Sequence, residues 1–442
     1  MKGAKQMTDN MLKVKNIIRN EKGNAIVLSI TVSIILMIIM ITTIIMLRQQ
    51  TNLVSGSRRK SEALSIAEAG LDAAIWQLER KQTLPFVDSL YNFSGSNTQG
   101  TYAVEVQKIN ESQYVVTSTG TAKNLPSDKV RSVEQDVYYV NLSSSVATFS
   151  DTNGGGTVTG SVKVIGPFYT NGNLSLSGSA EADSLDGTNG NPFLVRGNLY
   201  VDGSATIGKT SPMAVFVKGT MSRSNGNPLP AGTVKNFVSN QVPEVTLPEI
   251  VQSQYLSAAE ANDNAVYTGN LTLDTSDVSF NHFNYDKDTS PDATLTVDGV
   301  IYINGSLTIT KATNYSHASG NKATIFVNGP IRIEKELKAS ADYPDDSILA
   351  LINPNTTTTD DVYVAVSSGD TNPPMVQSYI YSAGQLRIKY KVKIVGSVIA
   401  NSLFLDTVPD LEVPLGSSNY PYLFPGKDLA FLTTSNWREV EP

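Results

Sequence analysis

The sequence lacks the residues on which many enzymes depend. It contains no cysteine and only two histidines, His282 and His317, among 442 residues. The absence of cysteine excludes disulfide scaffolds, thiol nucleophiles and cysteine-ligated metal sites. No P-loop, GxSxG or HExxH motif is present, and the glycine run at Asn153–Thr157 is expected to form a turn. We therefore expect no enzymatic activity, no cofactor and no metal.

Charged residues are sparse, at 17%, and unevenly distributed. Residues 1–60 carry ten Lys or Arg against two Asp or Glu, a net charge of +8, so the rest of the chain carries −15. An acidic body of this size would repel phosphate, so we expect no nucleic-acid partner. A basic N-terminal segment followed by an acidic remainder is typical of a membrane anchor that carries a soluble domain.

One long run, Ala25–Leu47, has no charge at all. As a helix it would span about 35 Å, enough to cross the hydrocarbon core of a bilayer. No A-x-A cleavage site follows it, which argues against a removable secretory signal. Six of the ten cations precede the run, so the positive-inside rule predicts a cytoplasmic N-terminus and an extracellular body, although Arg58–Lys60 is a counter-signal. We expect a single-pass protein in contact with membrane lipid.

Polar and apolar patterns around this run indicate one long helix. Hydroxyl groups inside the run can donate hydrogen bonds to neighbouring helices, but we expect them to bond to backbone carbonyls of their own helix. These hydroxyl groups belong to Ser29, Thr31, Ser33, Thr42 and Thr43. Beyond Arg48, an apolar stripe at intervals of three and four predicts that the helix continues to about Lys81, before Pro85, with a kink at Ser55–Ser57. The stripe comprises Leu64, Ala67, Leu71, Ala74, Ile75 and Leu78.

The N-terminal region resembles type IV pilin-like proteins, specifically the PilX-type minor pilins. The resemblance rests on a basic leader ending at Gly23, the apolar span and the AEAGL motif, which comprises Ala67, Glu68, Ala69, Gly70 and Leu71. It implies cleavage between Gly23 and Asn24 and packing of the apolar helix, from Ala25 through Leu28 to Leu47, into a filament.

Two positions depart from the pattern of major pilins. Leu28 stands where they carry Glu at the fifth position after the cut, and Asn24 stands where Phe is usual. The departures suit a minor, tip or initiating component and leave cleavage open. The alternative is a plain signal-anchor that is neither cut nor polymerised.

Three runs that alternate apolar and polar residues follow the helix, at 100–110, 113–120 and 130–140. They predict an antiparallel meander that covers the apolar stripe. Its apolar face is expected to include Tyr102, Val104, Val106, Tyr114 and Val116.

From about Ala147 the chain consists of short strand-like runs ended by glycine. Gly172 and Gly197 are 25 residues apart, and Gly305 and Gly329 are 24 apart. An irregular period of this length predicts a parallel solenoid, and the near-identical strings at 301–305 and 325–329 favour it over an antiparallel β-sandwich. The predicted fold class is mainly β: a long N-terminal transmembrane α-helix with a small antiparallel meander, followed by a right-handed parallel β-helix-like body.

The expected boundaries follow from these patterns. They are a basic leader at 1–23, a pilin-like helix at 24–82 with its transmembrane part at 25–47, a meander at 83–142, a first solenoid part at 143–222, a linker or cap at 223–290 containing a helix at 256–265, and a second solenoid part at 291–442.

Two sets of residues in the body could bind a ligand or could serve only the structure. The first set is acidic: Asp286, Asp288 and Asp292 have a spacing weakly suggestive of calcium binding, and Asp345–Asp346 and Asp360–Asp361 are adjacent pairs. None of them matches a calcium-binding loop, so we expect these carboxylates to be solvated. Tyrosines on a flat face can stack on sugar rings, whereas tyrosines in the core only fill space. The candidates are Tyr169, Tyr200, Tyr302, Tyr379, Tyr381 and Tyr390.

The sequence therefore predicts a membrane-anchored, pilin-like surface protein. Its expected role is that of a minor or tip component of a type IV pilus or pseudopilus, acting in assembly or adhesion with other pilin-like subunits and the pilus machinery as partners. The alternatives are a surface adhesin that binds glycan or a host surface and, less favoured, a calcium-dependent polysaccharide enzyme.

Overall fold

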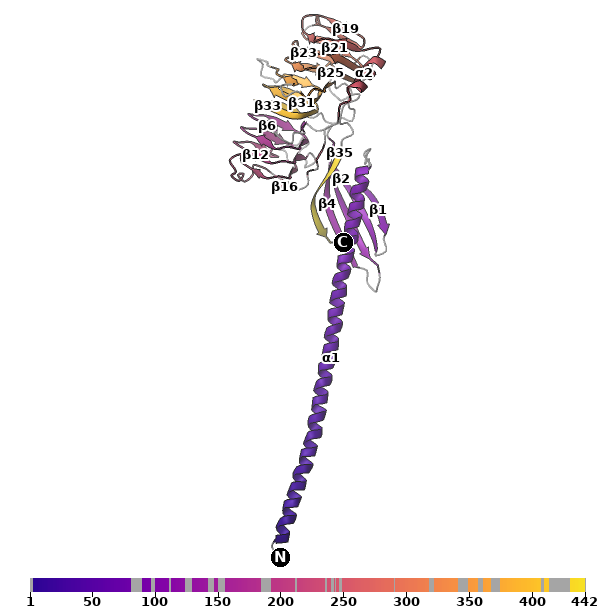
Figure 1. Ribbon diagram of the computed structural model, residues 1–442, viewed down its shortest axis with the longest axis vertical. Coiled ribbons are helices and arrows are strands. Elements are labelled where there is room, and N and C mark those ends of the chain that lie inside the picture. The colour runs from indigo at the N-terminus through magenta and orange to yellow at the C-terminus, as the bar shows by residue number, and fades with distance from the viewer. Residues whose placement is uncertain are drawn as a thin grey trace.

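The computed structural model of the chain consists of a long helix, a small sheet on the upper part of that helix and a large body of short strands (Figure 1). The parallel sheets of the body confirm the mainly β fold class. The structure describes residues 3–80, 90–96, 100–110, 113–123, 129–141, 147–149, 156–183, 192–210, 213–234, 237–239, 242, 244–245, 249–289, 291–317, 322–340, 349–356, 361–366, 374–406, 409–412 and 430–441.

Helix α1 runs without interruption from Gly3 to Arg80, a length of 78 residues or about 117 Å. The helix thus extends N-terminal of residue 24, where the leader was expected to end, through residues 3–24, which contain no proline and consist largely of residues that tolerate a helix. The helix also continues through Ser55–Ser57, where a kink was expected. Nothing lies within 4 Å of the position that a Cβ would take at Gly56, so no packing contact bends the helix there.

The upper part of α1 packs on a five-stranded antiparallel sheet, and the two together form the headpiece. The sheet order is β1 (Leu90–Ser96), β2 (Gly100–Asn110), β3 (Gln113–Ala122), β4 (Lys129–Asn141) and β35 (Ala430–Val440). Burial alternates along β3, and the buried side chains of the sheet meet the helix stripe in one core. That core comprises Ala67, Leu71, Ala74, Leu78, Val104, Val106, Tyr114, Val116, Val133 and Val137.

The predicted meander is therefore present, with two strands beyond the three expected. Strand β35 pairs with β4, so residues 430–440 belong to the headpiece and not to the second solenoid part to which they were assigned. The pairing has a physical reason, since it covers an edge of β4 that would otherwise be open to a foreign strand.

The body is a stack of short strands in three columns, here called the stack, and it includes β5 to β34. Column 1 contains β16 (Phe237–Ser239), β14 (Val215–Val217), β11 (Phe193–Val195), β8 (Phe168–Thr170), β5 (Ala147–Phe149), the first halves of β33 (Val398–Asp406) and β31 (Tyr379–Lys389), β28 (Ala350–Asn353), β25 (Ala323–Val327), β22 (Gly299–Asn304) and β17 (Val266–Thr268).

Column 2 contains β15 (Met221–Ser222), β12 (Leu199–Val201), β9 (Leu174–Leu176), β6 (Gly156–Val158), the second halves of β33 and β31, β29 (Val362–Val364), β26 (Ile331–Ile333), β23 (Leu307–Ile309) and β18 (Leu271–Leu273). Column 3 contains β13 (Thr206–Ile207), β10 (Glu181–Asp183), β7 (Lys163–Ile165), β34 (Asp410–Glu412), β32 (Lys393–Val395), β30 (Met375–Gln377), β27 (Leu337–Ala339), β24 (Thr313–Ser316), β21 (Ala293–Val297), β20 (Phe283–Asp286) and β19 (Val278–Phe280).

Pairing within the columns is parallel, except for β19, β20 and β21 at one end. The strings at 301–305 and 325–329 lie side by side, with Ile301 paired to Ile325, as their likeness predicted. Inward Val, Ile and Leu side chains of all three columns form one continuous core. The antiparallel sandwich is therefore wrong as an alternative, because a sandwich would require antiparallel neighbours throughout.

Glycine residues form a column of their own at the corner between columns 1 and 2. A Cβ added at Gly197 would lie 2.5 Å from the carbonyl of Gly172, and one at Gly329 would lie 2.4 Å from the carbonyl oxygen of Gly305. Successive backbones thus approach more closely than any side chain permits. The nearly constant glycine spacing in the sequence corresponds to one turn of the stack.

The order of strands along the stack differs from their order in the chain. The chain enters in the middle at β5, winds to β16 at one end, crosses to β17 at the other end and winds back to β33 and β34. There β33 pairs with β5 and β6, and β34 pairs with β7, along what we call the seam. The backbone N–H of Thr159 donates to the carbonyl of Leu405 across the seam at 3.1 Å, although 246 residues separate them.

This topology differs from the linker or cap expected at 223–290. Helix α2 covers Gln252–Ala261 rather than 256–265, and β17 to β20 are part of the stack itself. Both connections between headpiece and body, from β4 to β5 and from β34 to β35, leave from the middle of the stack. Figure 1 shows the yellow strands near β33 between the orange and the magenta ends.

The outward face of column 1 is covered by other elements over two stretches. Near one end, α2 packs Tyr255 on Phe326 with ring centroids 4.6 Å apart. Towards the other end, Val242 and the headpiece residue Tyr138 cover Tyr169, Leu194 and Phe216, and Tyr138 meets Phe216 edge to face at 5.1 Å. Tyr138 thereby fixes the headpiece against the body.

Candidate functional site

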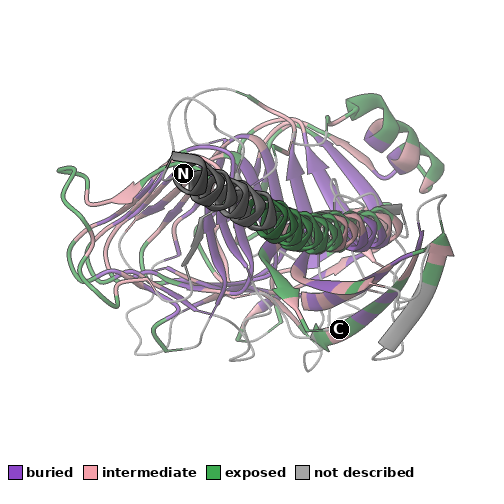
Figure 2. Ribbon diagram, turned by 90° about the horizontal axis from the view of Figure 1, so that it is seen from below, coloured by how far each residue is buried: buried purple, intermediate pink, exposed green. Residues whose placement is uncertain are grey.

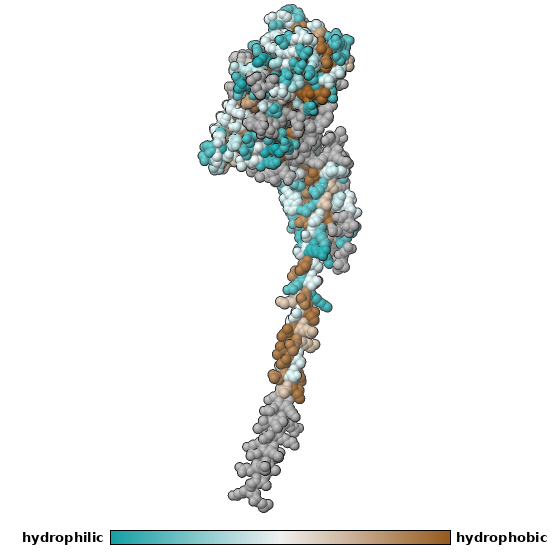
Figure 3. Space-filling model, viewed as in Figure 1, coloured by the Kyte–Doolittle hydropathy of each residue, from teal (hydrophilic) through white to brown (hydrophobic). Residues whose placement is uncertain are grey.

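The candidate functional site is the lower part of α1, which touches nothing else in the described chain. Every residue from Ala25 to Val54 is exposed, including Leu28 at 67% and Leu47 at 56%. Its most apolar window has a mean hydropathy of 2.8, and none of that window is buried. Figure 3 shows this part of the helix as a mainly brown rod below the headpiece. By length and composition, α1 is able to cross a membrane.

The backbone of this rod needs no partner, because each N–H and C=O is bonded within the helix. Its hydroxyl groups are satisfied in the same way. Thr31 donates to the carbonyl of Val27 at 2.8 Å, Thr42 to that of Ile38 at 2.9 Å and Thr43 to that of Ile39 at 2.8 Å. The expected back-bonding is thus confirmed for these threonines. What remains to be covered is apolar side-chain surface, which lipid or other apolar helices would bury.

Cationic side chains mark the end of this apolar rod and the start of the polar part of the helix. Arg48 directly follows Leu47, and Arg58 pairs with Glu62 one turn further along at 3.0 Å. The backbone of Gly23 and Asn24 lies inside α1. A cut between them would therefore leave a helix that starts with the apolar rod.

The AEAGL motif lies where the helix meets the sheet. Ala67 and Leu71 are buried and Gly70 faces the sheet, whereas Glu68 and Ala69 are exposed. A Cβ at Gly70 would lie 2.3 Å from Oγ of Ser118 in β3. The small residues of the motif therefore set the close approach of helix and sheet, and Glu68 is exposed. Figure 2 shows the colour of α1 changing from exposed green to buried purple towards this part of the helix.

Gly120, in β3, makes the same contact from the opposite side. A Cβ there would lie 2.3 Å from the carbonyl oxygen of Ala63 and 2.4 Å from the amide nitrogen of Ala67. Sequence reasoning did not single out Gly120. The signal was a glycine inside an alternating strand run, which often marks a close backbone approach.

Most candidate sugar-stacking tyrosines are buried. Tyr302, Tyr379 and Tyr381 lie under α2, and Tyr169 packs against Val242 and Val245. Only Tyr200, which is half-buried, and Tyr390, which is 47% exposed, remain accessible among those named. The outward strand positions of column 1 carry aromatic side chains because other elements cover them. The sequence interpretation missed this cover.

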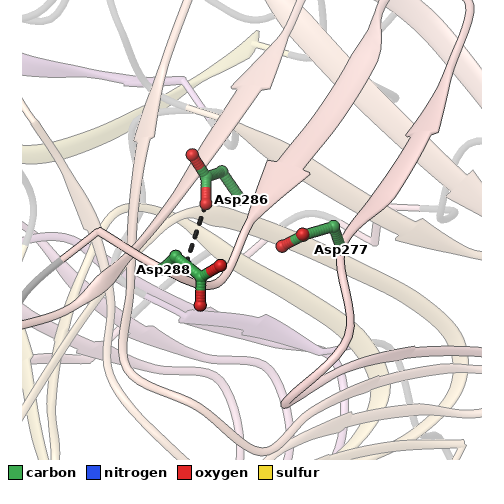
Figure 4. Close-up of side chains that lie close together, drawn as sticks. All are labelled: Asp277, Asp286 and Asp288. Carbon is green, nitrogen blue, oxygen red and sulfur yellow. Dashed lines mark hydrogen bonds between the residues drawn. The ribbon is translucent and has the colours of Figure 1, made fainter.

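Three carboxylates lie close together near the end of the stack that carries β19 and β20. Asp277, Asp286 and Asp288 bring one oxygen each within 4.8 Å of the others (Figure 4). Asp286 accepts the backbone N–H of Asp288 at 2.8 Å, Asp277 accepts that of Lys287 at 2.9 Å, and the Lys287 ammonium pairs with Asp288 at 3.1 Å. These carboxylates already have internal partners. Asp292, expected beside them, instead accepts from Asn314 at 3.3 Å.

The other acidic pairs give no site in the described part of the chain. Asp361 is buried and accepts the backbone N–H of Gln385 at 3.1 Å, which ties β29 to β31. Asp345, Asp346 and Asp360 lie outside the described residues.

No family model matches the chain, and no curated protein is significantly similar to it in sequence. Among solved structures, the crystal structure of competence-associated pilin ComZ from Thermus thermophilus is similar, with 12% identity and a TM-score of 0.42 over 86% of this chain and 97% of that chain. The crystal structure of an ice binding protein from an Antarctic Biological Consortium has 11% identity and a TM-score of 0.22 over 64% of this chain and 93% of that chain. At these TM-scores neither likeness establishes a shared function.

Proposed function

We propose that this chain is a pilin-like, membrane-anchored surface protein without enzymatic activity. The observation that carries the proposal is the continuity of α1. The same helix is a bare apolar rod over 25–47 and the packed spine of a headpiece over 63–78. A helix of this kind can be held by lipid before assembly and by neighbouring helices of similar subunits after assembly.

The charge distribution supports an outward orientation for the stack. The basic leader lies on the N-terminal side of the rod, and the acidic body lies on the other side. Cleavage after Gly23 would remove that leader and free Asn24 as the new N-terminus.

A minor or tip position suits the size and attachment of the body. The stack is attached at its middle and extends to either side of the headpiece connection (Figure 1). Such a body at every position would hinder close packing of a helical rod. Leu28, in place of a carboxylate, also deprives the rod of a charged partner for a neighbouring subunit's amine.

The test is to determine the mature N-terminus and to look for the protein in filaments. Intact mass and N-terminal peptides of protein from its own cells should begin at Asn24, and a Gly23→Val variant should retain the leader. Antibody against the stack should label sheared surface filaments. A chain that begins at Met1 and is absent from the sheared fraction would instead establish a plain signal-anchor.

A further inference from the structure

The outward face of column 2 carries an unusual group of side chains in its central part. Strand register places one outward residue of each turn in a single row. In order along the stack the row reads Thr272, Thr308, Arg332, Tyr363, Arg387, Phe404, Thr157, Ser175 and Tyr200. Small hydroxyl residues flank a central segment of two arginines and two aromatic rings.

These central residues point away from the core. Tyr363 lies between Val362 and Val364, and Arg387 lies between Leu386 and Ile388, all four of which are buried in the main core. Successive side chains of a strand point to opposite faces, so Tyr363 and Arg387 face outward. Arg332 is exposed, and Tyr363, Arg387 and Phe404 are half-buried.

Two cations converge on the Tyr363 ring. The Arg332 guanidinium carbon lies 5.6 Å from the ring centroid, and the Lys389 ammonium lies 5.9 Å from it. Within the described residues, neither cation forms an ion pair with a carboxylate. Arg387 differs, because it pairs with Asp406 at 2.9 Å.

The contribution of this arrangement to folding is small. Arg332 and Lys389 come from the strands on either side of Tyr363, and an exposed cation–π contact contributes only about 0.5–1 kcal/mol. Threonine or serine occupies the rest of the row, except for Tyr200 at its end. The group supplies a stacking surface and two cations free to meet an anion, on an otherwise acidic body.

We propose that this face, defined by Arg332, Tyr363, Lys389 and Phe404, binds an extended polysaccharide that carries carboxylate groups. Tyr363 and Phe404 lie two strand spacings apart, about 9.6 Å, so one extended chain running along the stack can contact both rings. Sugar rings present an apolar face to an aromatic ring, and arginine binds a carboxylate in a bidentate manner. The net charge of the body disfavours duplex nucleic acid, which carries one charge per about 1.7 Å, more strongly than a polysaccharide with one carboxylate per sugar ring, and salt screens the distant acids.

The binding test uses the full chain in detergent, applied to alginate beads, with dextran beads as the uncharged comparison. The wild type should be retained on alginate and released by salt. Tyr363→Ala and Arg332→Gln should each weaken retention about tenfold, which corresponds to the loss of one charged or stacking contact. Lys218→Gln is the matched control, because it removes an exposed cation elsewhere on the stack.

Thermal midpoints of the variants separate binding from folding. Arg332 is exposed, so Arg332→Gln should unfold at the wild-type temperature. Equal retention of wild type and Arg332→Gln would overturn the proposal, as would equal retention on dextran. Displacement of alginate by single-stranded DNA at a lower concentration than by free alginate would show that the face binds nucleic acid instead. Because none of these readouts depends on filaments, failure here leaves the proposed anchoring role untouched.

Discussion

Gly120 and Gly56 show, at the scale of the residue, that an added Cβ matters only where another atom already lies at its position. Gly120 lies where the backbone of α1 contacts β3, whereas Gly56 lies on the bare part of the same helix. Both are glycines inside long regular elements. Only the tertiary contact distinguishes them.

Gly120→Val should therefore destabilise the headpiece by about 1–3 kcal/mol or more, because its Cβ would overlap the backbone of Ala63 and Ala67. Gly56→Ala should instead be neutral or stabilise α1 by about 0.5–1 kcal/mol. Thermal unfolding of the two variants in the same detergent compares them. A Gly120→Val protein as stable as wild type would show that helix and sheet are not in contact.

Tyr138 links headpiece and body, and burial, followed by the nearby charge of Asp136, raises the pKa of its phenol from 10.0 to about 12. The unfolded chain loses this proton near pH 10, before the folded chain does. The contribution of Tyr138 to stability is therefore complete below pH 10 and is lost as pH rises towards 12. Tyr138→Phe cannot ionise, so its thermal midpoint should fall less steeply than that of the wild type over this range. Parallel profiles would contradict burial of Tyr138 at this interface.

At the scale of the element, α2 behaves as a cover for part of column 1. Tyr255 is 5% exposed and Ala259 fully buried, and they pack on aromatic side chains of three strands. The helix has no side-chain cap at its N-terminus, so packing must hold it in place.

Tyr255→Ala should destabilise the stack by about 3–5 kcal/mol, because it removes the ring that stacks on Phe326 and leaves a cavity above Tyr302 and Tyr381. Ser257→Ala, on the exposed side of α2, should change stability by less than about 0.5 kcal/mol. Urea unfolding followed by intrinsic tyrosine fluorescence measures both. Equal midpoints for the two variants would mean that α2 does not protect this face.

Sequence patterns predicted elements well where a local rule applied. The uncharged run gave the helix, alternation gave β2 to β4, and glycine spacing gave the period of the stack. Local rules failed where distant segments decide the outcome. The segment 430–440 was assigned to the second solenoid part only by its position in the chain, whereas it pairs with the free edge of β4 in the headpiece.

The same distinction explains the candidate site residues. Tyr302 and Tyr379 occupy outward strand positions, as a sugar-binding face would require. However, α2, which comes from elsewhere in the chain, buries them. Tyr363 was not singled out, because its importance depends on Arg332 and Lys389 in neighbouring turns. The contacts of these residues thus depend on how neighbouring strands are paired, and this strand register cannot be read from the sequence.

At the scale of the whole molecule, the seam is the least local feature of the fold. It joins the first and last turns of the stack in chain order, and both connections to the headpiece leave beside it. Its contacts join residues as far as 246 positions apart, so we expect the seam to form after the turns on either side of it.

The pair Lys163→Cys and Asp410→Cys tests the seam directly. These residues are register partners on adjacent parallel strands, about 4.8 Å apart, and the natural chain has no cysteine to interfere. Mild oxidation should form an intramolecular disulfide with a shifted gel mobility. The pair Lys163→Cys and Lys393→Cys is two strands apart, about 9.6 Å, and should not cross-link. Cross-linking of the second pair and not the first would reverse the strand order at the seam.

The account as a whole depends on α1 lying in the membrane with the stack outside the cell. A single cysteine at Ser224, an exposed residue of the stack, provides the most direct measurement when intact cells are treated with a membrane-impermeant maleimide. We predict full labelling of Ser224→Cys before lysis. Lys13→Cys, combined with Gly23→Val so that the leader is retained, should be labelled only after the cells are opened. Labelling of Ser224→Cys only after lysis would place the stack in the cytoplasm and contradict the account.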